Sequence, residues 1–439
     1  MKPIKIVYNW IGPLGPLWNT ELPNVLSFAS SAPNTTVNSH FWFADDAWYR
    51  VFNPLGKKFE LASVFGITPE DTFIYPLSIN WRTQFQNYFY IPDGILEFSH
   101  TQQNIIHSIR SGQGYIYLDM NAEAWVEDEH LHCLHQYFSD YHRIPLFKIF
   151  YITGCMNASK LYRSFLLRNK FSTDPRDMIQ IIGYPGCQSV YADEIKKWTI
   201  EIPTYDTNFV PEKLFLVWNR RFKPHRIGLS LALSKLGLLD RSYLSMSYVH
   251  PELPRETIYN QLDIHAYPQL GITNEDVETF VKKLPLVLDG ETNTAIMCAD
   301  FNLKTRKFYK NSLISIVTET NFDQRAMSFT EKSLKPLKEK HPFIIVGVNG
   351  ILQVLRDLGF KTFSDYWDES YDEIENPKAR MFKIIKICNE IGKWDTNKIL
   401  EFRKSVKPIL EHNFELIKQD LGLLVTENIY NNIRGMYPE

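Results

Sequence analysis

The sequence of 439 residues lacks long apolar runs and contains few cysteines. A membrane-spanning helix needs about 18 consecutive apolar residues or more, and no run in the chain reaches that length. The start, MKPIKIVYNW, has too short an apolar stretch for a signal peptide and instead predicts a strand. The five cysteines are scattered, odd in number and without a Cys-x-x-Cys pair, which argues against a disulfide framework. We therefore expect reduced thiols and a location in the cytoplasm of the producing or host cell.

The chain also lacks an excess of one charge. Lys and Arg total 48 and Asp and Glu total 50, so the net charge of −2 gives no support to a strongly basic nucleic-acid-binding protein. A local basic groove stays open as an alternative. Aromatic residues, at 14%, exceed what a core needs, so some could line a cleft.

Several sequence motifs of well-known enzyme classes are missing. There is no G-x-x-x-x-G-K-[ST] loop, no G-x-G-x-x-G after a strand and no G-x-S-x-G turn. These absences exclude P-loop ATPases, Rossmann dehydrogenases and α/β-hydrolases. His132 and His135 are three residues apart, but no second set of ligands with matching spacing accompanies them, so we expect no metal site.

What the sequence does contain is an alternation of short apolar runs with helix-like segments, which occurs once in each half. Examples are QGYIYLDM followed by EDEHLHCLHQYFSDY, and KLFLVW followed by PHRIGLSLALSKLGLL. Such alternation predicts an α/β fold with parallel sheets covered on both faces. A chain of this length is too long for one core, so we expect two Rossmann-like doubly wound domains facing a cleft, with a C-terminal helical segment. The expected boundaries are residues 1–198, a proline-flanked linker at 199–212, a second domain at 213–376, and helices at 377–439 that pack back across the first domain.

In open α/β sheets, ligands bind beyond the carboxyl ends of the strands. The second half places polar residues at strand ends or helix starts, and these candidates are Arg220, Arg221, Arg226, Glu319, Thr330, Glu331 and Lys332. Thr330 is a predicted N-cap, and a helix start offers free N–H groups and partial positive charge to an anion. Lys332 and Arg226 would add full charges, which together suit a diphosphate. Glu331 would accept hydrogen bonds from hydroxyl groups. The alternative is that Glu331 and Lys332 are ordinary solvated residues of a first helical turn.

The run SIVTETNF…SFTEKSLKPL…HPFIIVG resembles the donor-binding segment of GT-B glycosyltransferases, particularly the α1,3-fucosyltransferase family. The resemblance covers roughly residues 213–360 and implies that Arg226, matching the family's phosphate-binding arginine, and Lys332 hold the diphosphate of a sugar nucleotide. It further implies that Glu331 contacts the ribose. The segment LRDLGFKTFSDYWDESYDEI also resembles glycosyltransferase-like proteins of phages and large viruses.

The chain departs from the family pattern at three positions. Thr320 follows Glu319 where the family has Asn, and Ser328 stands where it has Tyr. Pro336 interrupts the helix, which we expect to bend or end early. These departures leave the nucleobase and the sugar open.

The first domain would supply the acceptor side and a base. Sugar transfer with inversion needs a carboxylate that removes the proton of the acceptor hydroxyl. Glu123, in the loop after the strand GYIYLDM, is the first candidate, Asp119 at the end of that strand is the second, and Asp45 or Asp46 is a distant third. The alternative for Glu123 is a carboxylate that caps the next helix.

The leading hypothesis is a glycosyltransferase that moves a sugar from a nucleotide-diphosphate donor to an acceptor hydroxyl, with inversion. Because no Asp-x-Asp stands out in a loop, we expect metal-independent catalysis and no cofactor besides the sugar nucleotide as co-substrate. The acceptor stays open among a glycan, a small molecule and modified DNA. One alternative is a DNA-modifying enzyme acting on a hydroxymethylated base, and another is a nucleotide-binding protein of the same fold without catalysis.

Overall fold

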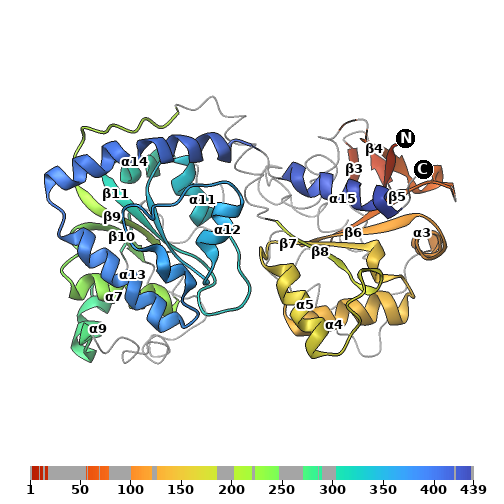
Figure 1. The fold of residues 1–439 in the computed structure, drawn as a ribbon, viewed down its shortest axis with the longest axis horizontal. Helices are drawn as coiled ribbons and strands as arrows, with labels where there is room; N and C mark the ends of the chain where they lie inside the picture. Colours follow the sequence, from red (N-terminus) through yellow and green to blue (C-terminus); the bar gives the residue numbers. More distant parts are fainter. Residues whose placement is uncertain are drawn as a thin grey trace, which may run out of the picture. The chain divides into compact units, whose positions relative to one another are not determined.

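The chain forms two compact units, Met1–Ser189 together with Asp420–Glu439, and Val190–Gln419 (Figure 1). The computed structural model describes residues 2–8, 10–12, 15–17, 56, 58–68, 70–78, 100–120, 126–184, 202–219, 223–246, 270–284, 286–288, 303–419 and 422–436. Each unit is built around one sheet of parallel strands, which confirms the expected α/β fold with two doubly wound domains.

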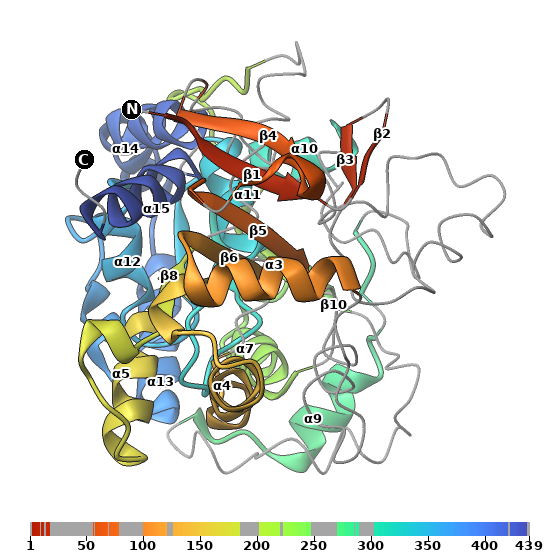
Figure 2. The same cartoon turned by 90° about the vertical axis from the view of Figure 1, so that its right-hand side faces the viewer.

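The first unit contains a six-stranded parallel sheet in the order β4-β1-β5-β6-β7-β8 (Figure 2). Its strands are β1 Ile4–Tyr8, β4 Phe59–Ser63, β5 Phe73–Ser78, β6 Gly114–Met120, β7 Ile149–Thr153 and β8 Gln180–Gly183. Its helices are α3 His100–Ser111, α4 Asp128–His135, α5 Ala158–Arg168 and α15 Gly422–Met436, and a π-helix at Gln136–Tyr141 continues α4. A short antiparallel pair, β2 Trp10–Gly12 and β3 Gly15–Leu17, lies outside the sheet. Every residue of β7 is buried, as expected for a strand with both faces covered.

The second unit contains a four-stranded parallel sheet in the order β10-β9-β11-β12. Its strands are β9 Lys213–Asn219, β10 Ser242–Met246, β11 Ser312–Thr318 and β12 Phe343–Val346. Its helices are α7 Pro224–Lys235, α9 Asn274–Val281, α10 Leu303–Lys310, α11 Glu331–Lys338, α12 Ile351–Asp357, α13 Pro377–Gly392 and α14 Thr396–Ile417. Helix α11 packs on α14, whereas α7 packs on α9 and α13 (Figure 1). Helix α11 ends two residues after Pro336, so it is a short helix.

The C-terminal helices differ from the expectation that residues 377–439 all return to the first domain. Helices α13 and α14 pack on α7 and α11 and belong to the second unit. Only α15 belongs to the first, where Ile429 and Ile433 are buried and the ring of Tyr430 meets the edge of Phe59 of β4. The three helices are all amphipathic, so their hydrophobic pattern could not distinguish which core each one covers.

The expected linker at 199–212 also packs more closely than a linker would. In its described part, 202–212, the carbonyl oxygen of Asp206 accepts hydrogen bonds from Nε and Nη2 of Arg403, at 3.0 and 2.6 Å. The same guanidinium lies 4.3 Å from the ring centre of Tyr205. This stretch is therefore fixed to α14 of the second unit. Among the described residues, no helix combines the length and hydropathy that crossing a membrane requires.

Candidate functional site

The second sheet reverses its strand order between β9 and β11, which are hydrogen-bonded neighbours. The chain leaves β9 through α7 to reach β10 on one side, and leaves β11 through α11 to reach β12 on the other. The two crossovers diverge, so the carboxyl ends of β9 and β11 form the topological switch point where α/β sheets bind ligands. The first turns of α7 and α11 follow these two strand ends.

The start of α11 is fixed by the buried carboxylate of Glu319, which follows the last residue of β11. Its Oε1 accepts hydrogen bonds from the backbone N–H of Thr330 at 3.1 Å and from Oγ of Ser333 at 2.5 Å. Its Oε2 accepts from Oγ1 of Thr330 at 2.7 Å and from the backbone N–H of Thr320 at 3.2 Å. Glu319 is completely buried, so its carboxylate clamps the helix start to the strand and does not face a ligand.

Thr330 is the N-cap of α11, as the sequence predicts. Its backbone is extended, and its Oγ1 accepts from the backbone N–H of Lys332 at 3.3 Å. The hydroxyl itself donates to Glu319, so one side chain serves both the cap and the clamp.

Glu331 and Lys332 form an ion pair in the first turn of α11. Nζ of Lys332 lies 2.7 Å from Oε1 of Glu331 and 3.2 Å from Oγ1 of Thr330. Each side chain is about one-fifth exposed, at 18% for Glu331 and 19% for Lys332. Burial alone would raise the pKa of Glu331, but the charge and hydrogen bond of Lys332 outweigh it and lower that pKa. Both side chains of the ion pair are therefore partly buried and partly accessible to solvent.

The start of α7 is attached to the end of β11 by three cationic or imidazole side chains. Nη2 of Arg226 donates to the carbonyl oxygens of Thr318 and Glu319 at 3.2 and 3.4 Å. His225 lies 3.0 Å from the Glu319 oxygen through Nε2, and Lys223 Nζ donates to Thr320 O at 2.8 Å. Arg226 is only 2% exposed, so it orders the strand end in this structure. Burial and the neighbouring charge of Arg226 lower the pKa of His225 to about 3, which keeps its ring neutral.

Asn219, the last residue of β9, carries a buried amide beside these groups. Its Oδ1 accepts a hydrogen bond of 2.5 Å from Oγ1 of Thr318, whereas its Nδ2 has no partner among the residues that the structure describes. A buried donor without a partner is uncommon in native proteins. Asn219, His225 and Lys223 are not among the sequence candidates, although all three stand in the run LVWNRRFKPHR that supplies the arginines.

The structure thus brings five of the sequence candidates to one edge of the second sheet. Arg226 contacts Glu319, Glu319 contacts Thr330, and Thr330 contacts Lys332, which pairs with Glu331. Arg220 and Arg221 lie outside the described residues, as do Glu123, Asp45 and Asp46. Asp119 lies near the end of β6 in register with Ser78 and Ile152, and only its backbone is described.

The histidines of α4 lie in the first unit. His135 is buried and lies 2.8 Å from the hydroxyl of Tyr162 through Nε2, while the ring of His132 packs on the edge of Phe165. Within the described part of the chain, no three His, Cys, Asp or Glu side chains are grouped so that they could hold a metal ion.

Comparison with known proteins gives distant structural similarity only. No protein-family profile matches the chain. No curated protein matches it in sequence.

Among solved structures, a trehalose-6-phosphate protein of E. coli bound with UDP-2-fluoro glucose is similar at 11% identity and a TM-score of 0.41, with both chains covered completely. A UDP-forming α,α-trehalose-phosphate synthase of Burkholderia vietnamiensis is similar at 8% identity and a TM-score of 0.39, over 84% of this chain and 73% of the other. The N-terminal domain of a Candida albicans trehalose-6-phosphate phosphatase is similar at 10% identity and a TM-score of 0.40, over 99% and 97%. Similarity at this level assigns neither activity nor substrate to the chain.

Proposed function

We propose that the chain is a sugar-nucleotide-dependent glycosyltransferase whose second unit binds the donor diphosphate at the switch point between β9 and β11. The observation that carries the proposal is the meeting of two helix starts at that point, one bearing Arg226 and the other Lys332. Helix starts and cations together favour a dianionic group. The chain of contacts through Glu319 and Thr330 places both cations at one edge of the sheet.

The roles of the residues follow from how they are held. Glu319 and Thr330 fix the first turn of α11, so that its N–H groups keep one direction before a ligand arrives. Lys332, partly exposed, is the cation that a diphosphate would reach first. Binding would draw Nζ away from Glu331, whose carboxylate would then accept hydrogen bonds from ribose or sugar hydroxyls. Lys332 and the two helix starts would stabilise the charge that grows on the departing diphosphate.

Arg226 needs a further step, because its guanidinium is buried against backbone carbonyls. In the proposal it either orders the strand end or turns to the phosphate when the donor binds. Arg226→Lys separates the two roles: an ammonium group cannot bind phosphate through a planar fork, so a direct phosphate role predicts weaker nucleotide binding. A purely positioning role would lower the unfolding midpoint and leave nucleotide affinity close to that of the wild type.

Titration calorimetry with UDP and GDP tests the donor site. We expect Lys332→Ala to weaken diphosphate binding by about 1.5–3 kcal/mol, the range for a hydrogen bond to a charged group. Lys393→Ala is a matched control, because Lys393 lies at the end of α13 and pairs with the exposed Glu390. Unchanged affinity in Lys332→Ala, with binding retained in the wild type, would refute the assignment of Lys332.

The acceptor side is proposed from sequence alone, with Glu123 as base and Asp119 as reserve. Glu123→Gln should abolish sugar transfer and keep donor affinity if the chain is an inverting enzyme. NMR of the product's anomeric proton distinguishes inversion from retention, and assay with a chelator tests metal independence.

A chain that binds UDP or GDP but neither transfers sugar nor hydrolyses the donor would be the non-catalytic alternative. A steep salt dependence of DNA binding would favour a modified base as acceptor.

A further inference from the structure

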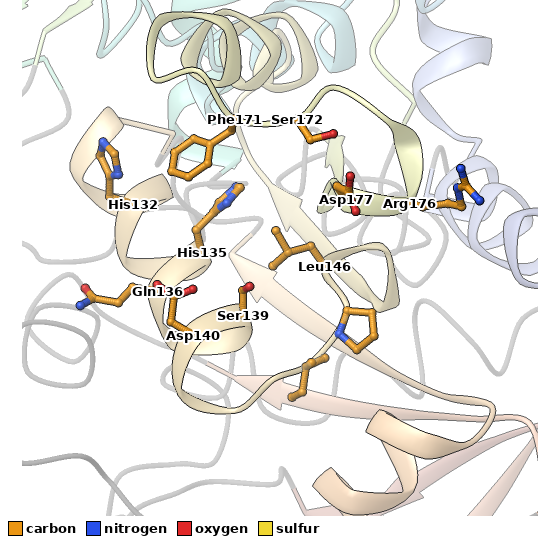
Figure 3. Close-up of a pocket in the computed structure, with 12 residues that line it drawn as sticks. His132, His135, Gln136, Ser139, Asp140, Leu146, Phe171, Ser172, Arg176 and Asp177 are labelled. Atoms are coloured by element: carbon orange, nitrogen blue, oxygen red, sulfur yellow. The ribbon is translucent and has the colours of Figure 1, made fainter.

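The first unit carries a depression of about 500 Å³ that the proposed donor site does not use (Figure 3). Its lining comes from α4, the π-helix, and the segments that lead into β7 and β8. The lining residues are His132, His135, Gln136, Ser139, Asp140, Ile144, Pro145, Leu146, Phe171, Ser172, Arg176 and Asp177. Because these segments precede their strands, the depression lies at the amino-terminal edge of the first sheet. Asp119 lies at the opposite, carboxyl-terminal edge.

The π-helix shapes one wall of this depression. Residues Gln136–Tyr141 continue α4 with wider turns, and the N–H of His142 donates to the carbonyl oxygen of Tyr137, five residues earlier, at 3.2 Å. Arg143 then takes a positive φ of 50° and ends the segment. Stretches of π-helix are rare and occur often at functional sites. Gln136, Ser139 and Asp140 of this segment all line the depression.

Several polar side chains line the depression, and the charges of Asp140 and Asp177 act on the neighbouring His135 and Arg176. Within the described residues, the side chains of Gln136, Ser139, Asp140 and Asp177 make no hydrogen bond or ion pair. Carboxylates accept hydrogen bonds from hydroxyl groups, a serine hydroxyl does both, and an amide offers a donor and an acceptor. Arg176, by contrast, is engaged by Asp174 at 3.1 Å and extends away from the centre in Figure 3.

An aromatic ring lies beside these polar groups. Phe171 is 37% exposed, yet its ring is held by His135, with centroids 4.7 Å apart, and by Phe165, stacked at 5.6 Å. Burial lowers the pKa of His135 to about 4, so this imidazole is neutral near pH 7. Leu146 forms a buried apolar part of the lining (Figure 3). The depression thus combines one aromatic ring, a buried apolar side chain and several polar groups that can bind hydroxyl groups.

We propose that this depression binds a neutral saccharide unit, with its C–H face against Phe171 and its hydroxyl groups on Asp140, Asp177, Gln136 and Ser139. The negative face of an aromatic ring attracts the partly positive C–H bonds of a sugar. Two carboxylates would repel an anionic ligand, and the volume falls in the range of small-ligand sites. The depression belongs to the first unit and the proposed donor site to the second, and we propose that the depression binds a sugar residue of a glycan other than the donor sugar.

Saturation-transfer NMR on the full chain tests the proposal, using methyl α- and β-glycosides of glucose, galactose and mannose together with maltose and cellobiose. We expect at least one probe to bind in the millimolar range, as few contacts with a small polar ligand allow. Phe171→Ala and Asp177→Asn should each weaken that binding about tenfold or more. Leu167→Ala is the control, because Leu167 is an exposed apolar residue of α5 outside the lining.

The variant Lys332→Ala separates this site from the donor site, since it should bind the saccharide like the wild type. Asp177→Asn keeps the proposal testable if Phe171→Ala perturbs the packing on Phe165, because Asp177 is exposed. The absence of binding by every probe, or binding that neither variant weakens, would overturn the proposal. Binding of guanidinium or methylammonium in place of any sugar would also overturn it and assign the carboxylates to a cation.

Discussion

Glu319 determines the geometry of the carboxyl edge of the second sheet more than any other single side chain described there. It is fully buried and its carboxylate accepts four hydrogen bonds, three of them from the start of α11. Its backbone oxygen accepts from the start of α7. A single residue therefore connects both helix starts to the end of β11.

We predict that Glu319→Gln lowers the free energy of unfolding by about 2–3 kcal/mol, because a neutral amide replaces an acceptor of several charge-assisted hydrogen bonds in a buried place. In the variant, the NH₂ group of the side-chain amide would replace one of the two carboxylate oxygens. It would then face hydrogen-bond donors and could not accept from them. Urea denaturation measures the change. Glu401→Gln, an exposed partner of Lys398 on α14, should change the unfolding free energy by less than about 0.5 kcal/mol. Equal effects of the two substitutions would contradict the role of Glu319.

His341 makes the stability of the second unit depend on pH. It is buried between β11 and β12, where Nδ1 lies 2.8 Å from Oγ of Ser315 and Nε2 lies 3.0 Å from the carbonyl oxygen of Ser312. Burial lowers the pKa of His341 to about 4, the Ser312 carbonyl opposes this shift, and the charge of Arg403 adds to it. The unfolded chain binds this proton with a pKa near 6.5, so between about pH 6.5 and 4 the unfolded state holds more protons.

The contribution of neutral His341 to the free energy of unfolding is therefore fully present above pH 6.5 and is lost as the pH falls toward 4. We predict that His341→Gln unfolds more easily at pH 7.5 but shows a shallower loss on acidification, by up to about 1.4 kcal/mol per pH unit. Urea unfolding from pH 7.5 to 4.5, with hydrogen exchange of the second unit as the readout, measures how the stability of the wild type and of the variant changes with pH. Parallel slopes for the wild type and the variant would refute the assignment.

Among the elements, the loops after β11 and β12 are held together by Arg380 of α13. Its guanidinium donates to the carbonyl oxygens of Gly347 at 3.0 Å, Ile374 at 2.5 Å and Glu375 at 3.1 Å, and also to that of Phe322. It lies over the ring of Phe322, 4.7 Å from its centre. Helix α13 thus does more than cover the sheet, because it fixes two of the loops at the switch-point edge.

We predict that Arg380→Met, which keeps most of the side-chain volume, destabilises the chain by at least about 3 kcal/mol, because several carbonyl oxygens would lose their donor. Arg380→Lys should recover only part of this, since a point charge cannot replace a planar fork. Lys386→Met, at an exposed position of the same helix, serves as the control. Thermal unfolding of the three variants gives the order, and a wild-type midpoint in Arg380→Met would contradict it.

How far the elements could be predicted depends on whether their signal is local. The strands predicted at GYIYLDM and KLFLVW and the cap predicted at Thr330 depend on nearby residues, and all three are confirmed. The role of Glu319 could not be predicted, because its donors come from residues 320–333 and their arrangement depends on the loop. Arg380 is 58 residues from Phe322, and no local pattern links the two. A buried arginine and a ligand-binding arginine look alike in sequence. The sequence pattern therefore predicts only a phosphate-binding role for Arg226 and does not predict its hydrogen bonds to the end of β11.

At the scale of the whole molecule, the chain leaves its first unit, builds the second and returns with one helix. Two consecutive helices therefore belong to different units: α14 ends at Ile417 in the second, and α15 carries Ile429 in the first. Both isoleucines are completely buried. The amphipathic pattern predicts that each helix covers a core, but the identity of that core is a non-local property.

This pair allows a matched test of the division. We predict that Ile429→Asp removes hydrogen-exchange protection from β1, β4 and β5, because an unpaired carboxylate enters the core of the first unit and costs several kcal/mol. Ile417→Asp should instead remove protection from α11 and α14 and leave the first sheet protected. The two substitutions are chemically identical and lie twelve residues apart, so intrinsic effects of the aspartate cancel in the comparison. Loss of protection in both units from either variant would mean that the units fold as one cooperative body, and loss in the second unit alone from Ile429→Asp would mean that α15 belongs there.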